Sequence, residues 1–122
     1  MVVAEIKTIA GEAVSRVPGS CGAFCGVGNP ESFFEQVRRE GLTPTFTRTF
    51  PDHHNYTQAD VDRLYQDAAE HHVECLITTA KDAVKLTSLA FQVPCFSLEI
   101  KVVIEDDERF AQQIKLVLTE SV

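Results

Sequence analysis

The stretch Ser20-Cys-Gly-Ala-Phe-Cys-Gly-Val-Gly-Asn-Pro-Glu-Ser-Phe-Phe34 decides the fold class. Its first half, residues 20–27, is small and apolar without alternation, which predicts a strand buried on both faces. Asn29 followed by Pro30 predicts the start of a helix, because Asn caps free backbone amides and Pro suits the first turn. A buried strand that leads directly into a helix is typical of an α/β domain with a parallel sheet.

The rest of the chain repeats this alternation. We expect further strands at residues 6–9, 42–50, 73–79 and 94–100, with another at 102–104. We expect helices at residues 30–40, 57–72, 81–86 and 106–118, the last from an apolar face at helical spacing. Thr57 with Asp60 three residues on resembles a capping box, with Asp in place of Glu, at the start of the second helix. This order predicts one α/β domain over residues 1–122, a three-layer αβα arrangement with a mainly parallel, Rossmann-like sheet.

Composition narrows the function classes. The chain has 122 residues, a net charge of −7, 44% hydrophobic and 24% charged residues, which fits one soluble, cytoplasmic domain. No apolar run approaches the roughly 18 residues of a transmembrane segment, and residues 1–14 lack the apolar core of a signal peptide. Residues 1–61 carry 7 acidic and 5 basic side chains, and residues 62–122 carry 11 and 6, so neither half is basic. Nucleic acid is therefore not an expected partner.

The four cysteines, Cys21, Cys25, Cys75 and Cys95, all lie in apolar stretches. This setting predicts buried, reduced thiols in a cytosolic protein, because free Cys behaves as a small hydrophobe. In a strand, Cys21 and Cys25 would lie about 13 Å apart, too far to share one zinc ion. The sequence therefore predicts no metal site.

Three polar loops are expected at the same edge of the sheet. They follow the strands expected at residues 20–27, 42–50 and 73–79, and they lie at residues 26–29, 50–56 and 78–82. Ligands of open parallel sheets bind beyond the carboxyl ends of the strands, where these loops emerge. This clustering predicts a binding or catalytic site.

Each loop has a functional and a structural interpretation. Gly26, Gly28 and Asn29 could admit an anion to a helix N-terminus, or form a tight turn with a cap. In the second loop, Asp52, His53 and His54 could supply a general base or proton relay, or form a polar turn. In the third loop, Thr79, Lys81 and Asp82 could meet phosphate, or form a helix cap with a surface ion pair. His71 and His72 end a helix, where a structural role is expected.

Taken together, the three loops resemble a known family. Gly26-Val-Gly-Asn-Pro-Glu-Ser-Phe-Phe34, Phe50-Pro-Asp-His-His-Asn-Tyr-Thr57 and Leu76-Ile-Thr-Thr-Ala-Lys-Asp-Ala-Val-Lys-Leu86 are similar to the C-terminal part of tetraacyldisaccharide 4'-kinase, the lipid A 4'-kinase. The resemblance covers roughly residues 22–98 and rests on three motifs in the same order.

The resemblance implies an ATP-dependent kinase that phosphorylates the 4'-hydroxyl of a lipid A precursor disaccharide at the cytoplasmic face of the inner membrane. The family has two α/β domains, and its N-terminal domain carries the P-loop, the groups that bind ATP and Mg²⁺, and a catalytic Asp. The P-loop signature Gly-x-x-x-x-Gly-Lys-Ser/Thr does not occur in this sequence. The chain is therefore expected to be the second domain, inactive alone, with the P-loop domain as its partner.

By the same resemblance, His53 corresponds to the histidine that pairs with the catalytic Asp of the other domain, with Asp52 beside it. The remaining candidate residues would line the substrate or nucleotide cleft: Gly26, Gly28, Asn29, His54, Thr79, Lys81 and Asp82. One position departs from the family, since Ala80 stands where the family usually has Glu. The alternative is a standalone, non-catalytic binding or regulatory module with the same fold. A P-loop domain encoded upstream of Met1 would favour the kinase.

Overall fold

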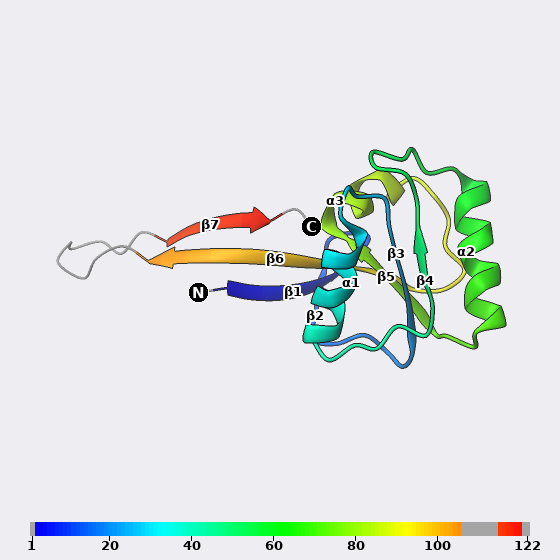
Figure 1. Ribbon diagram of the computed structural model, residues 1–122, viewed down its shortest axis with the longest axis horizontal. Coiled ribbons are helices and arrows are strands. Elements are labelled where there is room, and N and C mark those ends of the chain that lie inside the picture. The colour runs from blue at the N-terminus through cyan, green and yellow to red at the C-terminus, as the bar shows by residue number, and fades with distance from the viewer. Residues whose placement is uncertain (1, 106–114, 121–122) are drawn as a thin grey trace.

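The computed structural model describes residues 2–105 and 115–120. It has seven strands, β1 Val2–Thr8, β2 Ala13–Val14, β3 Cys21–Cys25, β4 Thr47–Thr49, β5 Cys75–Thr79, β6 Cys95–Glu105 and β7 Lys115–Glu120. The helices are α1 Pro30–Arg39, α2 Gln58–Glu70, α3 Ala80–Ala83 and the 3₁₀ turn η1 Val84–Leu86. Figure 1 shows these elements as a helix-covered body with a long β arm.

All seven strands belong to one mixed sheet, with the order β2-β1-β6-β5-β3-β4. Strands β4, β3, β5 and β6 are parallel to one another, as their buried, non-alternating sequences and intervening helices predict. Strands β1 and β7 pair with β6 in the antiparallel sense, and β2 pairs with β1 in the same sense. The predicted α/β class is confirmed, and the antiparallel strands extend the sheet beyond its parallel part.

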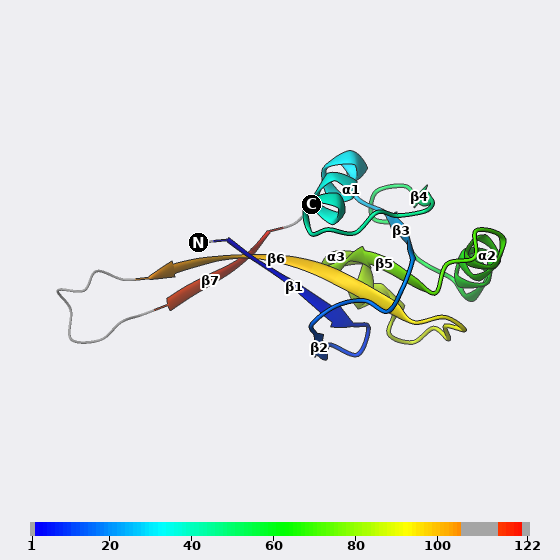
Figure 2. The same cartoon turned by 90° about the horizontal axis from the view of Figure 1, so that it is seen from below.

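Helices cover both faces of the sheet, so the predicted three layers are confirmed (Figure 2). On one face, α1 buries Phe33, Phe34 and Val37 against the strand side chains. On the other face, α2 and η1 pack around Phe24 and Leu76. Strand β3 is buried at all five positions, which is why its sequence shows no alternation.

The caps that the sequence predicts are formed. The Asn29 side chain accepts a hydrogen bond from the Ser32 amide and caps α1, with Pro30 in the first turn. Thr57 and Asp60 form a reciprocal capping box at the start of α2. These contacts fix where both helices begin, directly after two of the polar loops.

The four cysteines are all buried, as predicted, and none is in a disulfide. Burial raises the pKa of the Cys25 thiol to about 11, helped by the nearby Asp82 carboxylate. Burial also raises the pKa of Cys75 to about 12. The thiols therefore behave as part of the core.

Several boundaries differ from the sequence prediction. The first strand begins at Val2, not near residue 6, and is followed by the unpredicted β2. The strand expected at residues 42–50 is only Thr47–Thr49, and the strand expected at 102–104 is part of the long β6. An edge strand with Pro44 before it has few partners, which explains its short length.

The helix expected at residues 106–118 is wrong for residues 115–118, which lie in β7. Residues 106–114 lie outside the described part of the chain. Beyond Ile100, one edge of β6 extends past the end of β5, and β7 pairs with this edge from Ile100↔Glu120 to Glu105↔Lys115. Backbone N–H and C=O groups along this edge of β6 need partners, which favours a strand beside it. The apolar residues that predicted a helix are also compatible with a strand.

Candidate functional site

The three polar loops meet at one edge of the sheet because β3, β4 and β5 are parallel and adjacent. Hydrogen bonds join the loops directly. The His53 amide donates to the Gly26 carbonyl over 3.3 Å, and the Phe50 amide donates to the Cys25 carbonyl over 2.8 Å. The site expected from the sequence is therefore brought together, although its members have different roles.

Asp82 holds all three loops together. Its side chain is 1% exposed. Its Oδ2 accepts hydrogen bonds from the Gly26 amide over 3.1 Å and the Thr79 hydroxyl over 2.6 Å. Its Oδ1 accepts the Tyr56 hydroxyl over 3.0 Å. Both carboxylate oxygens thus accept hydrogen bonds from groups within the protein. Asp82 therefore fixes the three loops relative to one another.

Gly26 lies at the closest approach of these loops. A Cβ atom at this position would lie 3.0 Å from the Pro51 carbonyl oxygen and 3.2 Å from the Tyr56 hydroxyl. A larger residue here would force its neighbours to move by a few tenths of an ångström, so glycine favours the close packing of the first and second loops. Gly26 is buried, so its function here is packing rather than direct contact with a ligand.

Tyr56 was missed as a site residue by the sequence interpretation. It is 8% exposed and donates to Asp82, and it contacts Phe24 edge to face. Burial, followed by the negative charge of Asp82, raises the pKa of the Tyr56 hydroxyl. The hydroxyl therefore stays protonated and can keep donating to the carboxylate. The sequence signal for it is an aromatic residue at the end of the second polar loop, residues 50–56.

Asp52 and His53 form the exposed tip of the second loop. Their side chains are 46% and 72% exposed, and His53 Nε2 lies 3.6 Å from Asp52 Oδ2. His53 has a φ of 61°, a left-handed conformation that turns the chain sharply at this residue. Asp52 also lies beside the exposed Gly28, where a Cβ would be 3.4 Å from Asp52 Oδ2. This carboxylate–histidine pair is free to meet a group outside the domain.

The His54 side chain does not lie at this exposed tip but contacts other side chains of the domain. Its Nε2 lies 2.9 Å from Asp60 Oδ2, and its ring stacks on Phe50 with centroids 4.8 Å apart. The Lys85 ammonium donates to its carbonyl over 3.2 Å. His54 therefore links the loop to the capping box of α2, and Asp60 joins Tyr56 as a supporting residue that the sequence did not assign to the site.

The remaining candidate residues also divide into exposed residues and residues held inside the protein. Lys81 and Asn29 are exposed at the edge, whereas Thr79 is 2% exposed and caps α3 by accepting the Asp82 amide over 2.9 Å. His71 ends α2, with Nδ1 2.9 Å from the Asp67 carbonyl oxygen, in keeping with its predicted structural role. Among the candidate residues, the exposed polar groups are thus Asp52, His53, Asn29 and Lys81.

The three loops do not fit a magnesium–nucleotide group. Asp52 is their one exposed carboxylate, since both oxygens of Asp82 are occupied by protein donors. Among residues 2–105 and 115–120, no three His, Cys, Asp or Glu side chains form a metal-binding cluster. Magnesium with a nucleotide is usually held by carboxylates together with phosphates, so one carboxylate and one lysine are an incomplete set.

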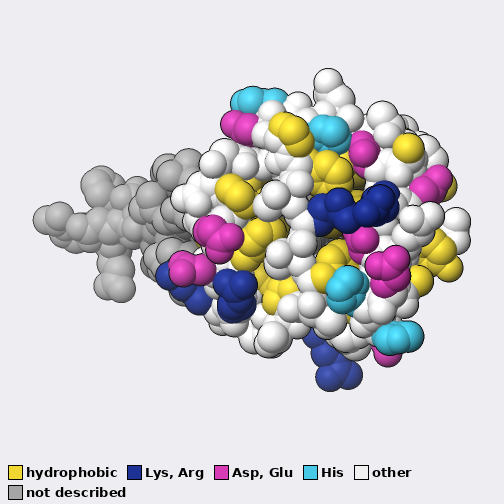
Figure 3. All heavy atoms as spheres, turned by 45° about the vertical axis from the view of Figure 1, so that its right-hand side comes forward, with side chains coloured by type: hydrophobic (Ala, Val, Ile, Leu, Met, Phe, Trp, Pro, Cys, Tyr) yellow, Lys and Arg dark blue, Asp and Glu magenta, His cyan; other side chains and the backbone are white. Residues whose placement is uncertain are grey.

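The described helices include none that is long and apolar enough to cross a membrane. On the face that carries α2, Lys and Arg side chains lie next to Asp, Glu and His (Figure 3). That face offers a mixed surface rather than one broad patch of positive charge.

These features define an α/β domain whose parallel strands present an exposed carboxylate–histidine pair at their carboxyl edge. The profile of one family, LpxK, described as tetraacyldisaccharide-1-P 4'-kinase, matches residues 3–119. The chain belongs to this family.

Relatives and one solved structure agree with this assignment. Proteins named tetraacyldisaccharide 4'-kinase from Rickettsia canadensis and Rickettsia felis are 45% identical over 80 residues, 66% of this chain. The chain spans about a quarter of their length, 24% in both cases. A crystal structure of LpxK from Aquifex aeolicus in complex with ATP has a TM-score of 0.53 and 23% identity, covering 81% of this chain and 30% of that one. This structural likeness supports the fold.

Proposed function

We propose that this chain acts as the C-terminal α/β domain of an ATP-dependent tetraacyldisaccharide 4'-kinase, which phosphorylates the 4'-hydroxyl of a lipid A precursor. Membership of the family and the 45% identity to proteins of that name support the activity. In this proposal an N-terminal P-loop domain supplies the ATP and Mg²⁺ sites, and the whole enzyme works at the cytoplasmic face of the inner membrane. The 122-residue chain by itself is inactive.

The observation that carries the proposal is the exposed Asp52–His53 pair at the carboxyl edge of the sheet. In this proposal His53 corresponds to the family histidine that pairs with a catalytic carboxylate of the other domain. A histidine that is 72% exposed, on a loop fastened at Gly26, is well placed to reach such a group. His54, by contrast, is engaged with Asp60.

In this proposal His53 sets the basicity of the carboxylate that takes the proton of the sugar hydroxyl. Asp52 Oδ2 lies 3.6 Å from His53 Nε2, close enough to limit the orientation of the ring. Asp82, Gly26 and Tyr56 do not touch the reacting groups in this arrangement. They hold the loop so that His53 returns to the same place in each catalytic cycle.

The first prediction tests this role in the whole kinase. We expect His53→Ala to lower kcat by about 10²-fold, within the range of general acid–base assistance, while ATP affinity changes less than twofold. His71→Ala is the matched control, because His71 lies at the far end of α2, and its kcat should stay within about twofold. Steady-state kinetics and ATP binding are measured for both variants.

Near-normal turnover of His53→Ala would contradict the assignment of His53. If Asp52→Ala then abolished turnover, the loop would still act through its carboxylate. If neither change had an effect, the loop would be only a polar turn, and the non-catalytic interpretation would be favoured.

A further inference from the structure

The left-handed turn at His53 has to be held by its surroundings. Its φ of 61° lies in a region that costs free energy for a residue with a Cβ atom, so contacts on both sides must fix the chain. Before the turn, the Phe50 amide donates to the Cys25 carbonyl, and the His53 amide itself donates to the Gly26 carbonyl. The contacts that follow the turn therefore decide how firmly the His53 side chain is placed.

After the turn, Lys85 holds the main chain of the loop. Its ammonium donates a hydrogen bond to the His54 carbonyl, with 3.2 Å between Nζ and the oxygen. A charged donor makes a stronger hydrogen bond than a neutral one, and this bond is partly buried, where it is strengthened further. Lys85 is 31 residues from His54 in the sequence, so the bond ties the second loop to the segment that follows the third.

The main chain and the side chain of His54 have separate partners. The ring lies against Asp60, whereas the carbonyl accepts from Lys85. Among residues 2–105 and 115–120, Lys85 forms no ion pair with a carboxylate. The position of the residue next to His53 is therefore fixed twice, and the lysine restrains the backbone itself.

The 3₁₀ turn η1, which carries Lys85, is fixed on both sides. Three residues before Lys85, the buried Asp82 carboxylate accepts the Tyr56 hydroxyl. Directly after Lys85, Leu86 is fully buried in the core, and its carbonyl accepts the Leu89 amide over 3.1 Å. The second loop is thus bound at two points, Tyr56 and the His54 carbonyl, by one short segment.

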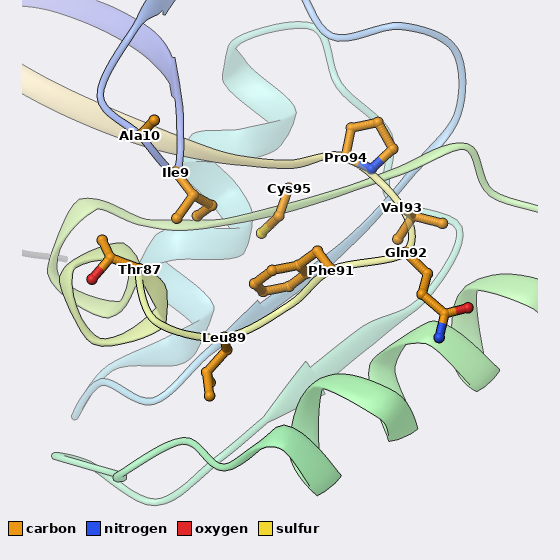
Figure 4. Close-up of a pocket in the computed structure, with 9 residues that line it drawn as sticks. All are labelled: Ile9, Ala10, Thr87, Leu89, Phe91, Gln92, Val93, Pro94 and Cys95. Carbon is orange, nitrogen blue, oxygen red and sulfur yellow. The ribbon is translucent and has the colours of Figure 1, made fainter.

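The chain beyond η1 packs on the same core. Leu89 and Phe91 lie against the cluster of buried residues that contains Leu86 and Cys95. Both line the pocket in Figure 4, where the Phe91 and Cys95 side chains point toward one another. The backbone of η1 is therefore well anchored, and the ammonium of Lys85 offers the loop a fixed point.

We propose that Lys85 is a positioning residue for His53: by holding the His54 carbonyl, it fixes the left-handed turn and the direction of the exposed imidazole. This inference rests on the proposed function, in which His53 meets a carboxylate of the P-loop domain. Lys85 itself touches no reacting group in this arrangement. Without its ammonium the imidazole is still present but is less often in the productive position, which lowers kcat more than it changes affinity.

The test is steady-state kinetics of the whole kinase with Lys85→Met, which removes the ammonium and keeps an unbranched apolar side chain. We expect kcat to fall about tenfold, because a loosened loop misplaces the imidazole, while KM for ATP changes less than about twofold. Lys85→Arg keeps a charged donor and should retain kcat within about threefold. The matched control is Val84→Met, which places the same side chain at a 73% exposed position of the same turn and should keep kcat within about twofold.

A double variant separates positioning from a direct role. If Lys85 acts through His53, Lys85→Met has nothing to misplace once the imidazole is absent. We therefore expect kcat of His53→Ala/Lys85→Met to lie within about twofold of His53→Ala alone, whereas independent effects would lower it about tenfold further. That further loss would overturn the inference, because Lys85 would then act without His53.

Unchanged kcat in Lys85→Met would also overturn the inference, since the hydrogen bond to the His54 carbonyl would then not place the imidazole. An equal loss of kcat in Lys85→Met and Lys85→Arg would overturn it too, because retaining a donor would have no effect. The kinase assignment would survive each of these results, because His53→Ala tests it separately.

Discussion

At the scale of single residues, neighbouring side chains of one loop have opposite roles. His53, with its left-handed backbone, is exposed beside Asp52, whereas His54 is held against Asp60 and Phe50. Below them, Asp82 accepts hydrogen bonds from all three loops of the site. A buried carboxylate with three donors is costly to remove, because each donor would lose its partner.

The second prediction concerns Asp82. Asp82→Ala leaves the Gly26 amide and the Tyr56 and Thr79 hydroxyls without this acceptor, so we expect the free energy of unfolding to fall by about 3 kcal/mol. Lys81→Ala, an adjacent exposed position, should change it by less than about 0.5 kcal/mol. Urea denaturation of both variants provides the measurement. Equal stability of the two would show that Asp82 does not hold the loops.

At the scale of elements, the site loops are fixed by the helices that follow them. The capping box of Thr57 and Asp60 begins α2, and Asp60 also contacts His54. The hydrogen bond from the Thr57 amide, together with the one from His54, lowers the pKa of the Asp60 carboxyl. Two turns further along this helix, Asp67 binds Arg48 of β4 over 2.6 Å and ties the edge strand to α2.

The third prediction follows from Asp60. We expect Asp60→Ala to lower the free energy of unfolding by about 1–2 kcal/mol at pH 7, through loss of the capping box. Since the folded pKa lies below the unfolded value of about 3.9, this stabilisation is complete above that pH and lost as pH falls through the folded pKa. The difference from the unmodified chain should therefore shrink as the pH falls through the lowered folded pKa.

Urea denaturation at pH 7 and at pH 2.5 checks this dependence. Asp62→Ala serves as the control, because Asp62 is exposed and bonded to the exposed Gln58 amide. A difference between Asp60→Ala and the unmodified chain that stayed constant with pH would mean that the carboxylate charge is not responsible.

At the scale of the whole molecule, β6 joins two parts of the structure. Its first residues complete the parallel sheet beside β5, and its last residues pair with β7 in the projecting arm (Figure 1). Strand β1 pairs along the opposite edge from Thr8↔Phe96 to Val2↔Val102. The four buried cysteines lie in the body, within three of the strands of this sheet.

The fourth prediction concerns these cysteines. Because burial raises the pKa of Cys25 to about 11 and of Cys75 to about 12, little thiolate exists at pH 8. We expect a thiol reagent to modify the folded chain only slowly, as the core opens, and to find four groups after denaturation without reductant. Two or no free groups in the denatured chain would mean that disulfides form.

The fifth prediction is that the 122-residue chain folds but neither transfers phosphate nor binds ATP at micromolar concentration. Phosphoryl transfer requires a cradle for the β- and γ-phosphates and a held metal ion, and the three loops offer one exposed lysine and one exposed carboxylate. Calorimetry with ATP and Mg²⁺ is the measurement, with the whole kinase as the positive control. Micromolar binding would instead favour a standalone nucleotide-binding module.

The sequence by itself determined the α/β class, the buried strands, the two helix caps and the burial of the cysteines. These features depend on local patterns, since an apolar run without alternation or an Asn-Pro pair carries its structural preference within a few residues. The same reasoning placed three polar loops at one edge, because parallel strands end on the same side.

Only the tertiary structure decided which of these polar residues are available to a ligand. The sequence predicts that Asp82 and Thr79 line the cleft. Hydrogen bonds from Gly26 and Tyr56 instead hold the Asp82 carboxylate inside the protein. The two adjacent histidines differ because His53 lies at a sharp backbone turn, whereas His54 contacts Asp60, six residues away. Residues 115–118 form a strand because β6 leaves an open edge beside them. The contacts of Asp82 and the pairing of β7 with β6 depend on groups distant in sequence, whose positions cannot be inferred from a local pattern.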